Sequence, residues 1–415
     1  MNSVTPLAEQ LKHSALTLAA ASQRDDALLP LRQRAESQLK ALSFPEKRQE
    51  AWKYTTLTAL RAGQLTTMAT PLVDNTAAHS GSVPALADNV ILITNGQLPA
   101  MLPALPPGVT AAPLSHSETD SNVPDTPFGW LNGASLSDGL LLTTAPNQKI
   151  NRAIHVVFFN QAETPCHAAN RLHVALADGS ELTLIEHYLG SGPVLANAVT
   201  QIRAGANSHL THYRLQSEAA DTLHIGNLQI DQLRDSRVDS SQLMCGNTLR
   251  RNDVHVRLLE QGAQLAMRGV FIARDSSHID NQVRVEHVAA HCHSEQVYKG
   301  IAGEQGRAVF NGHIHIHPHA SGSDAALSNN NMLLSNGAEI DSKPVLEIYN
   351  DDVKCAHGTT MGQMNESQLF YLRSRGIDTA TAKRMLGTGF VNATLMAMPD
   401  STLQDWAMHW LGEAL

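Results

Sequence analysis

The segment Val254-His255-Val256-Arg257-Leu258 alternates apolar and polar residues, which is the pattern of a β-strand with one buried face. No helical pattern of 10–15 residues separates it from its neighbours, which argues against a βαβ sheet. Comparable short segments follow one another from about residue 149, at 173–176, 182–185, 223–225, 283–285, 308–310 and 313–316. This part of the chain is therefore expected to be mainly β.

The turns that lead into these strands resemble one another. A glycine, a small residue, a polar residue and an aliphatic residue recur at 179–182, 262–265 and 337–340, at irregular intervals. Short strands after recurring turns favour a stacked β-helix, in which each turn of the chain covers the face of its neighbour. The same pattern leaves a β-sandwich open as the alternative.

Helical patterns flank the strands. They predict helices over residues 7–21 and 27–42, one that begins after Asn365 and stops at Gly376, and one after Pro399. The region from about Thr66 to Thr126 indicates a loosely packed connection with one strand at 90–94. We expect an N-terminal helical region and linker over 1–145, a β-helix core over 146–345 and a C-terminal helical domain over 346–415. The last helix has one apolar stripe, formed by Leu403, Trp406, Ala407, Trp410 and Leu411.

Composition excludes several classes of function. The 415 residues carry 30 basic and 39 acidic side chains, a net charge of −9, without the clustered Lys and Arg that nucleic acid requires. No apolar run approaches the roughly 18 residues that span a bilayer, and the N-terminus has no signal-peptide pattern. The four cysteines are far apart, which favours free thiols in a reducing compartment. The expected location is the cytoplasm, with no nucleic-acid and no membrane partner.

Motifs for phosphate handling and for serine catalysis are absent from the sequence. It contains no G-x-x-x-x-G-K-[ST] loop, so the chain is expected to bind and hydrolyse no ATP itself. It also contains no G-x-S-x-G elbow, which removes support for a serine hydrolase.

The run His313-Ile314-His315-Ile316-His317 places three imidazoles on one face of a strand, close enough to share a metal ion. A solvated strand face over a core of isoleucines explains the same alternation. No carboxylate or cysteine lies at a local spacing that completes such a site. The run carries the alternative hypothesis of a β-helix metalloenzyme or carbohydrate-active enzyme that uses His313, His315 and His317.

Cys355 and His357 share one face if their segment is extended, and they lie where the strand pattern gives way to helices. Thiolate and imidazole together suit iron, an iron–sulfur cluster or zinc. Lys354 favours the thiolate, whereas Asp351 and Asp352 oppose it. Two ligands do not complete a four-coordinate site, so the others must come from elsewhere in the fold or from a partner. A structural cysteine beside a surface histidine is the alternative.

The surrounding sequence resembles the SufB/SufD family of the SUF iron–sulfur cluster assembly system. The match is dense at 346–358 (LEIYNDDVKCAHG) and 368–377 (QLFYLRSRGI), and it includes 306–312 (GRAVFNG) and 329–334 (NNNMLL). The segment 50–55 (EAWKYT) is similar to the N-terminal E-x-W-K-Y-T element of SufD-type subunits. The His313–His319 run is not part of the family pattern, and nothing carries over to it.

The resemblance implies a right-handed parallel β-helix flanked by N-terminal and C-terminal helical regions. It also implies a non-catalytic scaffold, not an enzyme, in a complex with SufB and the SufC ATPase. A homodimer is a further possibility for the chain in isolation. The C-terminal helices are expected to dock SufC. Cys355 and His357 are expected at the SufB–SufD interface, where a transient iron–sulfur cluster or iron is shared with side chains of SufB.

Overall fold

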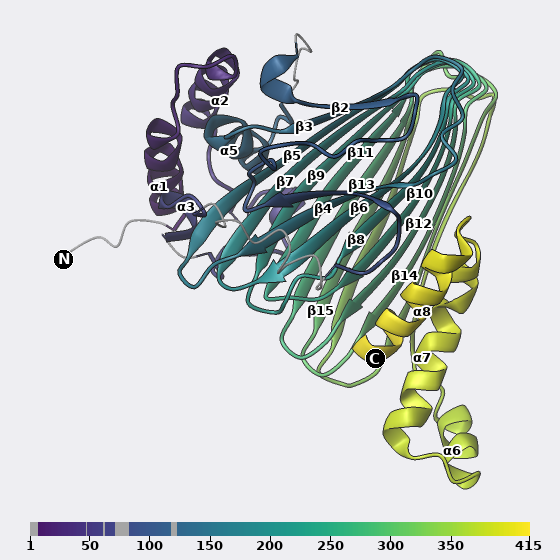
Figure 1. The fold of residues 1–415 in the computed structure, drawn as a ribbon. Coiled ribbons are helices and arrows are strands. Elements are labelled where there is room, and N and C mark those ends of the chain that lie inside the picture. Colours follow the sequence, from purple (N-terminus) through teal and green to yellow (C-terminus); the bar gives the residue numbers. More distant parts are fainter. Residues whose placement is uncertain (1–6, 47, 61–62, 71–82, 118–122) are drawn as a thin grey trace.

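Two stacked β-sheets form most of the molecule (Figure 1). The computed structural model describes residues 7–46, 48–60, 63–70, 83–117 and 123–415. From β3 onward, successive strands alternate between the two nine-stranded sheets, so that two strands make one turn of a solenoid. Among the named strands of the described residues, β2 and β3 pair antiparallel and the other pairings are parallel. The predicted β-helix is confirmed, and the β-sandwich alternative is wrong.

From β3 onward, each sheet takes every second strand of the chain. Sheet A contains, in spatial order, β2 (Val109–Pro113), β3 (Leu140–Thr144), β5 (Cys166–Leu176), β7 (Val194–Ala204), β9 (Leu223–Gln232), β11 (Leu249–Leu258), β13 (His278–His287), β15 (Arg307–Ile316) and β17 (Glu339–Ile348). Sheet B contains β1 (Asn89–Thr94), β4 (Ile154–Gln161), β6 (Glu181–Ser191), β8 (His209–Gln216), β10 (Arg237–Cys245), β12 (Gln264–Ala273), β14 (His293–Ala302), β16 (Ser323–Leu333) and β18 (Val353–Gln363).

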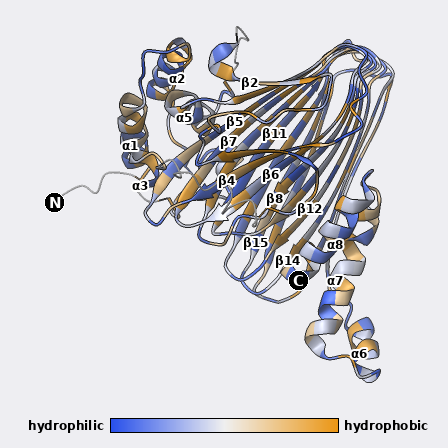
Figure 2. Ribbon diagram, in the orientation of Figure 1, coloured by the Kyte–Doolittle hydropathy of each residue, from blue (hydrophilic) through white to orange (hydrophobic). Residues whose placement is uncertain are grey.

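Aliphatic side chains from both sheets fill the space between them. Val254 and Val256 of β11 lie beside Val283 and Val285 of β13 in register, and all four are buried. The alternating residues point outward, and Figure 2 shows apolar and polar positions alternating along the strands. Burial of each such side chain stabilises the fold by about 1.5–3 kcal/mol. The alternation in the sequence thus reports which face of each strand enters the core.

Left-handed residues stack in the turns between rungs. Gly179 and Gly262, from the recurring turns of the sequence, have φ angles of +67° and +77°. A Cβ atom on Gly262 would lie 2.1 Å from Oδ1 of Asp235, which has a φ of +56° in the turn one rung earlier. Both the backbone conformation and the close stacking therefore require glycine at position 262.

Gly262→Ala is expected to destabilise the protein by at least about 1–2 kcal/mol, because alanine pays the left-handed penalty and displaces Asp235. The midpoint of urea unfolding should fall accordingly. The matched control is Gly389→Ala in α7 (Thr379–Met396), where a new Cβ meets no atom within 4 Å and alanine favours the helix. Equal midpoints for Gly262→Ala and wild type would contradict the stacked-turn argument.

The described helices of the N-terminal region pack on sheet A near the beginnings of β7, β9 and β11 and leave most of the rest of its outer face uncovered by helices (Figure 1). This region contains α1 (Leu7–Ala21), α2 (Leu29–Ala41), the 3₁₀ turn η1 (Glu50–Trp52), the short α3 (Gly63–Thr66), η2 (Leu114–His116) and α5 (Pro127–Ser135). The first two match the predicted helices, and β1 matches the predicted strand within the connection. That connection includes residues 71–82 and 118–122, which lie outside the described residues.

The E-x-W-K-Y-T segment anchors this region to the solenoid. The Arg251 guanidinium of β11 lies 3.9 Å from the centre of the Trp52 ring and donates to the Ala51 carbonyl oxygen. Thr55 donates its hydroxyl hydrogen to the Asp280 carboxylate of β13. The segment therefore fixes the N-terminal helices against β11 and β13.

Three C-terminal helices follow the strands, and two of them cover part of the outer face of sheet B. The three are α6 (Glu366–Ser374), α7 and α8 (Ser401–Ala414), and α7 and α8 pack on the strands β6 to β14. Leu403, Ala407 and Leu411 of the predicted stripe are buried, so the stripe packs on the protein itself. Strands continue to Gln363, so the helices begin well after residue 346. None of the described helices is long and apolar enough to cross a membrane.

Candidate functional site

The last turn of the solenoid, formed by β17 and β18, is its open end. Among the described strands, β17 pairs only with β15 and β18 only with β16, so each leaves one edge without a neighbouring strand. Nine of the eleven residues of β18 are exposed. A long, exposed edge strand is a surface to which another chain can add strands. At the open end, both sheets therefore stop at a strand that can still accept a partner strand.

Cys355 and His357 lie on β18 and point to the same side. In register, they neighbour Ala325 and Leu327 of β16, both of which belong to the core between the sheets. Cys355 is partly buried and packs on that core, whereas His357 is exposed. Both side chains therefore lie over the end of the core, where it opens toward solvent. The expectation that the pair shares one face agrees with this register.

The surroundings of Cys355 favour the neutral thiol over the thiolate in the isolated chain. Burial, and then the Asp324 carboxylate, raise the pKa of the thiol above its ordinary value. Lys354, expected to favour the thiolate, lies on the opposite face of β18, because alternate residues of a strand point to opposite sides. The proton must therefore leave when a metal ion or cluster binds at this sulfur.

Beyond His357 on β18, Thr359 belongs to a hydrogen-bond network that the sequence analysis did not predict. Thr359 donates to the Ser342 hydroxyl at 2.9 Å, and Ser342 donates to Oδ1 of Asn329 at 2.7 Å. The Asn331 amide donates to the same oxygen at 2.7 Å. The network joins β16, β17 and β18 and holds the last turn in place. Its one signal in the sequence is the Asn329-Asn330-Asn331 run.

The ligand set at the open end is incomplete within this chain. Among the described residues, no third His, Cys, Asp or Glu gathers with Cys355 and His357 into a group able to hold a metal ion. The two side chains can supply one sulfur and one nitrogen ligand. A tetrahedral site would need two further ligands from outside.

Of the three histidines in the alternative metal site, the structure gathers two, His313 and His315, into a group of possible ligands and leaves out His317. His313 and His315 gather with Glu347 of β17, whereas His317 lies 3.0 Å from the Glu286 carboxylate of β13. The rings of His315 and His317 contact each other, with centroids 4.3 Å apart. The missing carboxylate therefore comes from the next strand of the sheet.

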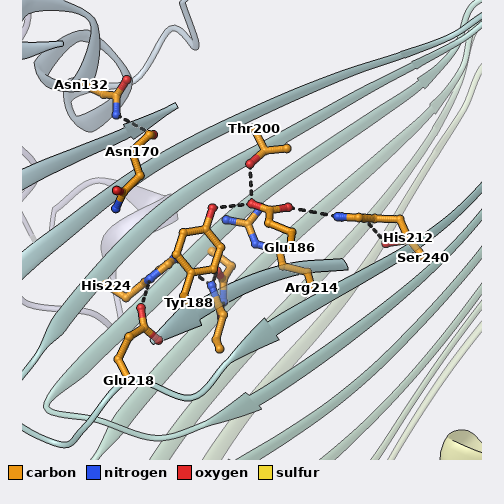
Figure 3. Close-up of polar contacts among 12 residues, drawn as sticks. Asn132, Asn170, Glu186, Tyr188, Thr200, His212, Arg214, Glu218, His224 and Ser240 are labelled. Carbon is orange, nitrogen blue, oxygen red and sulfur yellow. Dashed lines mark hydrogen bonds and ion pairs between the residues drawn. The ribbon is translucent and has the colours of Figure 1, made fainter. Parts of the chain in front are cut away.

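Ionised groups are also buried between the sheets, on the strands shown in Figure 3. Glu186 of β6 accepts hydrogen bonds from Tyr188, Thr200 and His212, the last at 3.0 Å. Burial alone would raise the pKa of Glu186, but Arg214 and His212 outweigh it and hold that pKa at about 2. The carboxylate is thus ionised at neutral pH inside the core.

A second buried ion cluster adjoins the first. Glu218 accepts from Nδ1 of His224 at 2.6 Å and lies 2.9 Å from Nη1 of Arg250, and all three side chains are fully buried. Tyr188 packs edge-on against His224 and so connects the two clusters (Figure 3). Because these groups are buried and mutually paired, we interpret both clusters as structural.

Comparison with known proteins places this geometry in context. A family model described as the SUF system FeS cluster assembly, SufBD core domain, matches residues 158–390. The chain is 29% identical to the iron–sulfur cluster assembly protein SufD of Escherichia coli K12 over 398 residues, which cover 93% of each chain. It is 28% identical to an iron–sulfur cluster assembly SufBD family protein of Synechocystis, over 92% of this chain and 89% of that protein. It is 26% identical to the chloroplastic protein ABCI7 of Arabidopsis thaliana, over 98% of this chain and 89% of that protein.

Proposed function

The chain belongs to the SufBD family of the SUF iron–sulfur cluster assembly system, and from this premise we propose that it is a non-catalytic scaffold subunit of a cytoplasmic assembly complex. Its partners in this proposal are SufB and the SufC ATPase. The nascent cluster, or iron on its way into one, is the cargo of the complex. The chain supplies one face of the site and binds no ATP.

The open end is the observation that carries the proposal. In the described part of the chain, β17 and β18 each have one edge without a neighbouring strand, and no third ligand gathers with Cys355 and His357. A partner subunit that adds strands to β17 and β18 brings its own side chains over the same end of the core. SufB is the proposed partner at this end, and His357, assisted by Cys355, ligates the cluster together with side chains of SufB.

The C-terminal helices offer a separate surface for the ATPase. Helix α6 projects away from the solenoid (Figure 1), and of its nine residues only Leu369 is buried. Phe370 and Tyr371 are 72% and 57% exposed, and Met385 of α7 is also exposed. Large apolar side chains gathered on a projecting helix mark a protein interaction site. We assign this surface to SufC, whose ATP-driven movement would reshape the open end through the shared complex.

Membership of the family favours this role over the metalloenzyme or carbohydrate-active enzyme proposed from the histidine run. A homodimer through the open end remains the proposed form of the chain without its partners, because identical strands can pair edge to edge. Binding of SufB then competes with this homodimer.

Gly358→Lys together with Gly362→Lys is expected to abolish stable association with SufB. A Cβ atom at either position meets no atom within 4 Å, so the isolated chain should fold normally. Lysines on an edge strand oppose addition of another strand. The measurement is co-purification of the chain with co-expressed SufB and SufC, followed by size-exclusion chromatography.

The matched control is Glu295→Lys on β14, an exposed residue of a strand with neighbours on both edges. This variant should associate with SufB as the wild type does. Normal association of the double lysine variant would show that β18 is not the docking edge. Loss of folding is checked separately by the thermal melt of the isolated chain.

A further inference from the structure

Two imidazoles and a carboxylate converge on the outer face of sheet A, away from the open-end ligands. They are His313 and His315 of β15 and Glu347 of β17. Oε2 of Glu347 lies 3.2 Å from Nε2 of His313 and 3.0 Å from Nδ1 of His315. The three ligand atoms all lie within 4.8 Å of one another.

The pairing of β15 with β17 fixes this arrangement. His315 is the register partner of Glu347, and both side chains point outward because Ile314 and Ile316 enter the core. His313, two residues earlier, projects on the same side of β15. The backbone therefore holds all three groups on neighbouring strands without any loop.

The separations match those between the ligands of a single metal ion. Bonds of about 2.0–2.2 Å from a divalent transition metal to nitrogen and oxygen, at angles near 90–110°, put neighbouring ligand atoms about 3.0–3.5 Å apart. Both distances to Oε2 of Glu347 fall in this range. We propose that His313, His315 and Glu347 form a binding site for one divalent transition-metal ion, such as Zn²⁺ or Fe²⁺.

The surroundings support the site and leave it accessible. The Tyr349 ring packs on His315, with centroids 5.3 Å apart, and covers one side of it. The histidine side chains are 19% and 15% exposed, and Glu347 is 44% exposed. His313 also lines a groove of about 520 Å³ along the outer face of sheet A. Water or an exogenous ligand can therefore fill the remaining coordination positions.

Next to the proposed site, ion pairs with Glu286 hold His317, His255 and Arg284 in place. The Glu286 carboxylate contacts His317 at 3.0 Å and His255 and Arg284 at 2.8 Å each. It is thus already committed to three partners, whereas Glu347 contacts only the two proposed histidine ligands among the ion pairs of the described residues. This division explains why His317 lies outside the proposed site.

Two imidazoles and one carboxylate select metals of intermediate softness. This ligand set with open positions occurs in zinc sites and in non-haem Fe²⁺ sites, and it disfavours Ca²⁺ and Mg²⁺, which prefer oxygen ligands. The proposal goes beyond the scaffold function, because its residues lie on the other sheet from Cys355 and His357. Failure of either proposal leaves the other untouched.

The test uses the full chain, stripped with a chelator and titrated with Co²⁺ and then Zn²⁺ under reducing conditions. We expect one Co²⁺ per chain, with d–d absorption bands that Zn²⁺ abolishes on displacing it. Glu347→Gln, which keeps the shape of the side chain, and His315→Ala should each weaken binding at least about 100-fold, since even the loss of an outer-shell partner costs 10–100-fold. Anaerobic titration with Fe²⁺ extends the test to iron.

Two control variants make the outcome decisive. His319→Ala removes an exposed histidine of the same run, and Cys355→Ser with His357→Ala removes the open-end ligands. Both should retain binding of one Co²⁺ per chain. Absence of stoichiometric binding, equal loss in His319→Ala, or loss only in the Cys355 and His357 variant would each overturn the proposal.

Discussion

Glu218→Ala is expected to lower the free energy of unfolding by about 3–5 kcal/mol, the cost of breaking a buried ion pair by removing one partner. The substitution leaves the Arg250 guanidinium charged and without its carboxylate in a fully buried position. It also removes the acceptor of the His224 Nδ1 hydrogen bond. Urea unfolding followed by circular dichroism measures the change.

A second substitution separates loss of the pair from loss of packing. In Glu218→Ala with Arg250→Met both charges are absent, so the double variant should recover much of the stability lost in the single variant. The surface control is Glu181→Ala, whose partner Lys149 is 68% exposed, and its cost should stay below about 1 kcal/mol. A double variant as unstable as the sum of its single variants would contradict the buried-pair argument.

The same clusters are expected to lower the free energy of unfolding in acid. Burial would raise the pKa values of Glu186 and Glu218, but their cationic neighbours prevail and lower them, that of Glu186 to about 2. A carboxyl with a lowered pKa contributes stability above its unfolded value near 4.5, and this contribution disappears as pH falls toward the folded value. Wild-type stability should therefore decline between about pH 4.5 and pH 2, and Glu218→Ala should show a shallower decline.

Cys355→Ser with His357→Ala should reduce the cluster content of the assembled complex at least about tenfold, because this chain then supplies no ligand at the open end. His357 is exposed and Cys355 only partly buried, so the variant should fold and associate normally. The measurement is anaerobic reconstitution of the complex with SufB and SufC, followed by visible absorption and by iron and sulfide analysis.

Lys354→Ala is the matched control, since its side chain lies on the same strand but on the opposite face. It should retain the wild-type cluster content. If the Cys355 and His357 variant forms the complex with an unchanged cluster yield, the two residues only pack, and the ligands come from elsewhere.

Much of the solenoid was predictable because its aliphatic positions alternate. The alternating segments at 254–258 and 283–285 lie in β11 and β13, and helix α1 has its predicted bounds. Strand β16 was not predicted because its inward row includes Asn329 and Asn331 in place of aliphatic residues. Their side chains are satisfied by a hydrogen-bond network that no local pattern reveals.

Of the candidate sites, too, one part was predictable from the sequence and another was not. Cys355 and His357 are two residues apart, so strand alternation alone predicts their common face. Glu347 is 32 residues from His315, and other in-register partners are as few as 26 residues apart, as Leu223 and Leu249 are. With a variable number of residues per turn, the sequence does not specify which carboxylate faces which histidine.

The order of the strands in the solenoid also has a consequence for synthesis on the ribosome. From β5 onward, each strand pairs with one that emerged earlier, about 30 residues before it. Turns can thus be added one by one to a growing stack while the chain is still being made. Cys355 and His357 lie on the last strand, and helices α7 and α8 must then fold back over strands made much earlier. A chain that stalls between β17 and β18 would consequently carry a nearly complete stack but neither of the two open-end ligands.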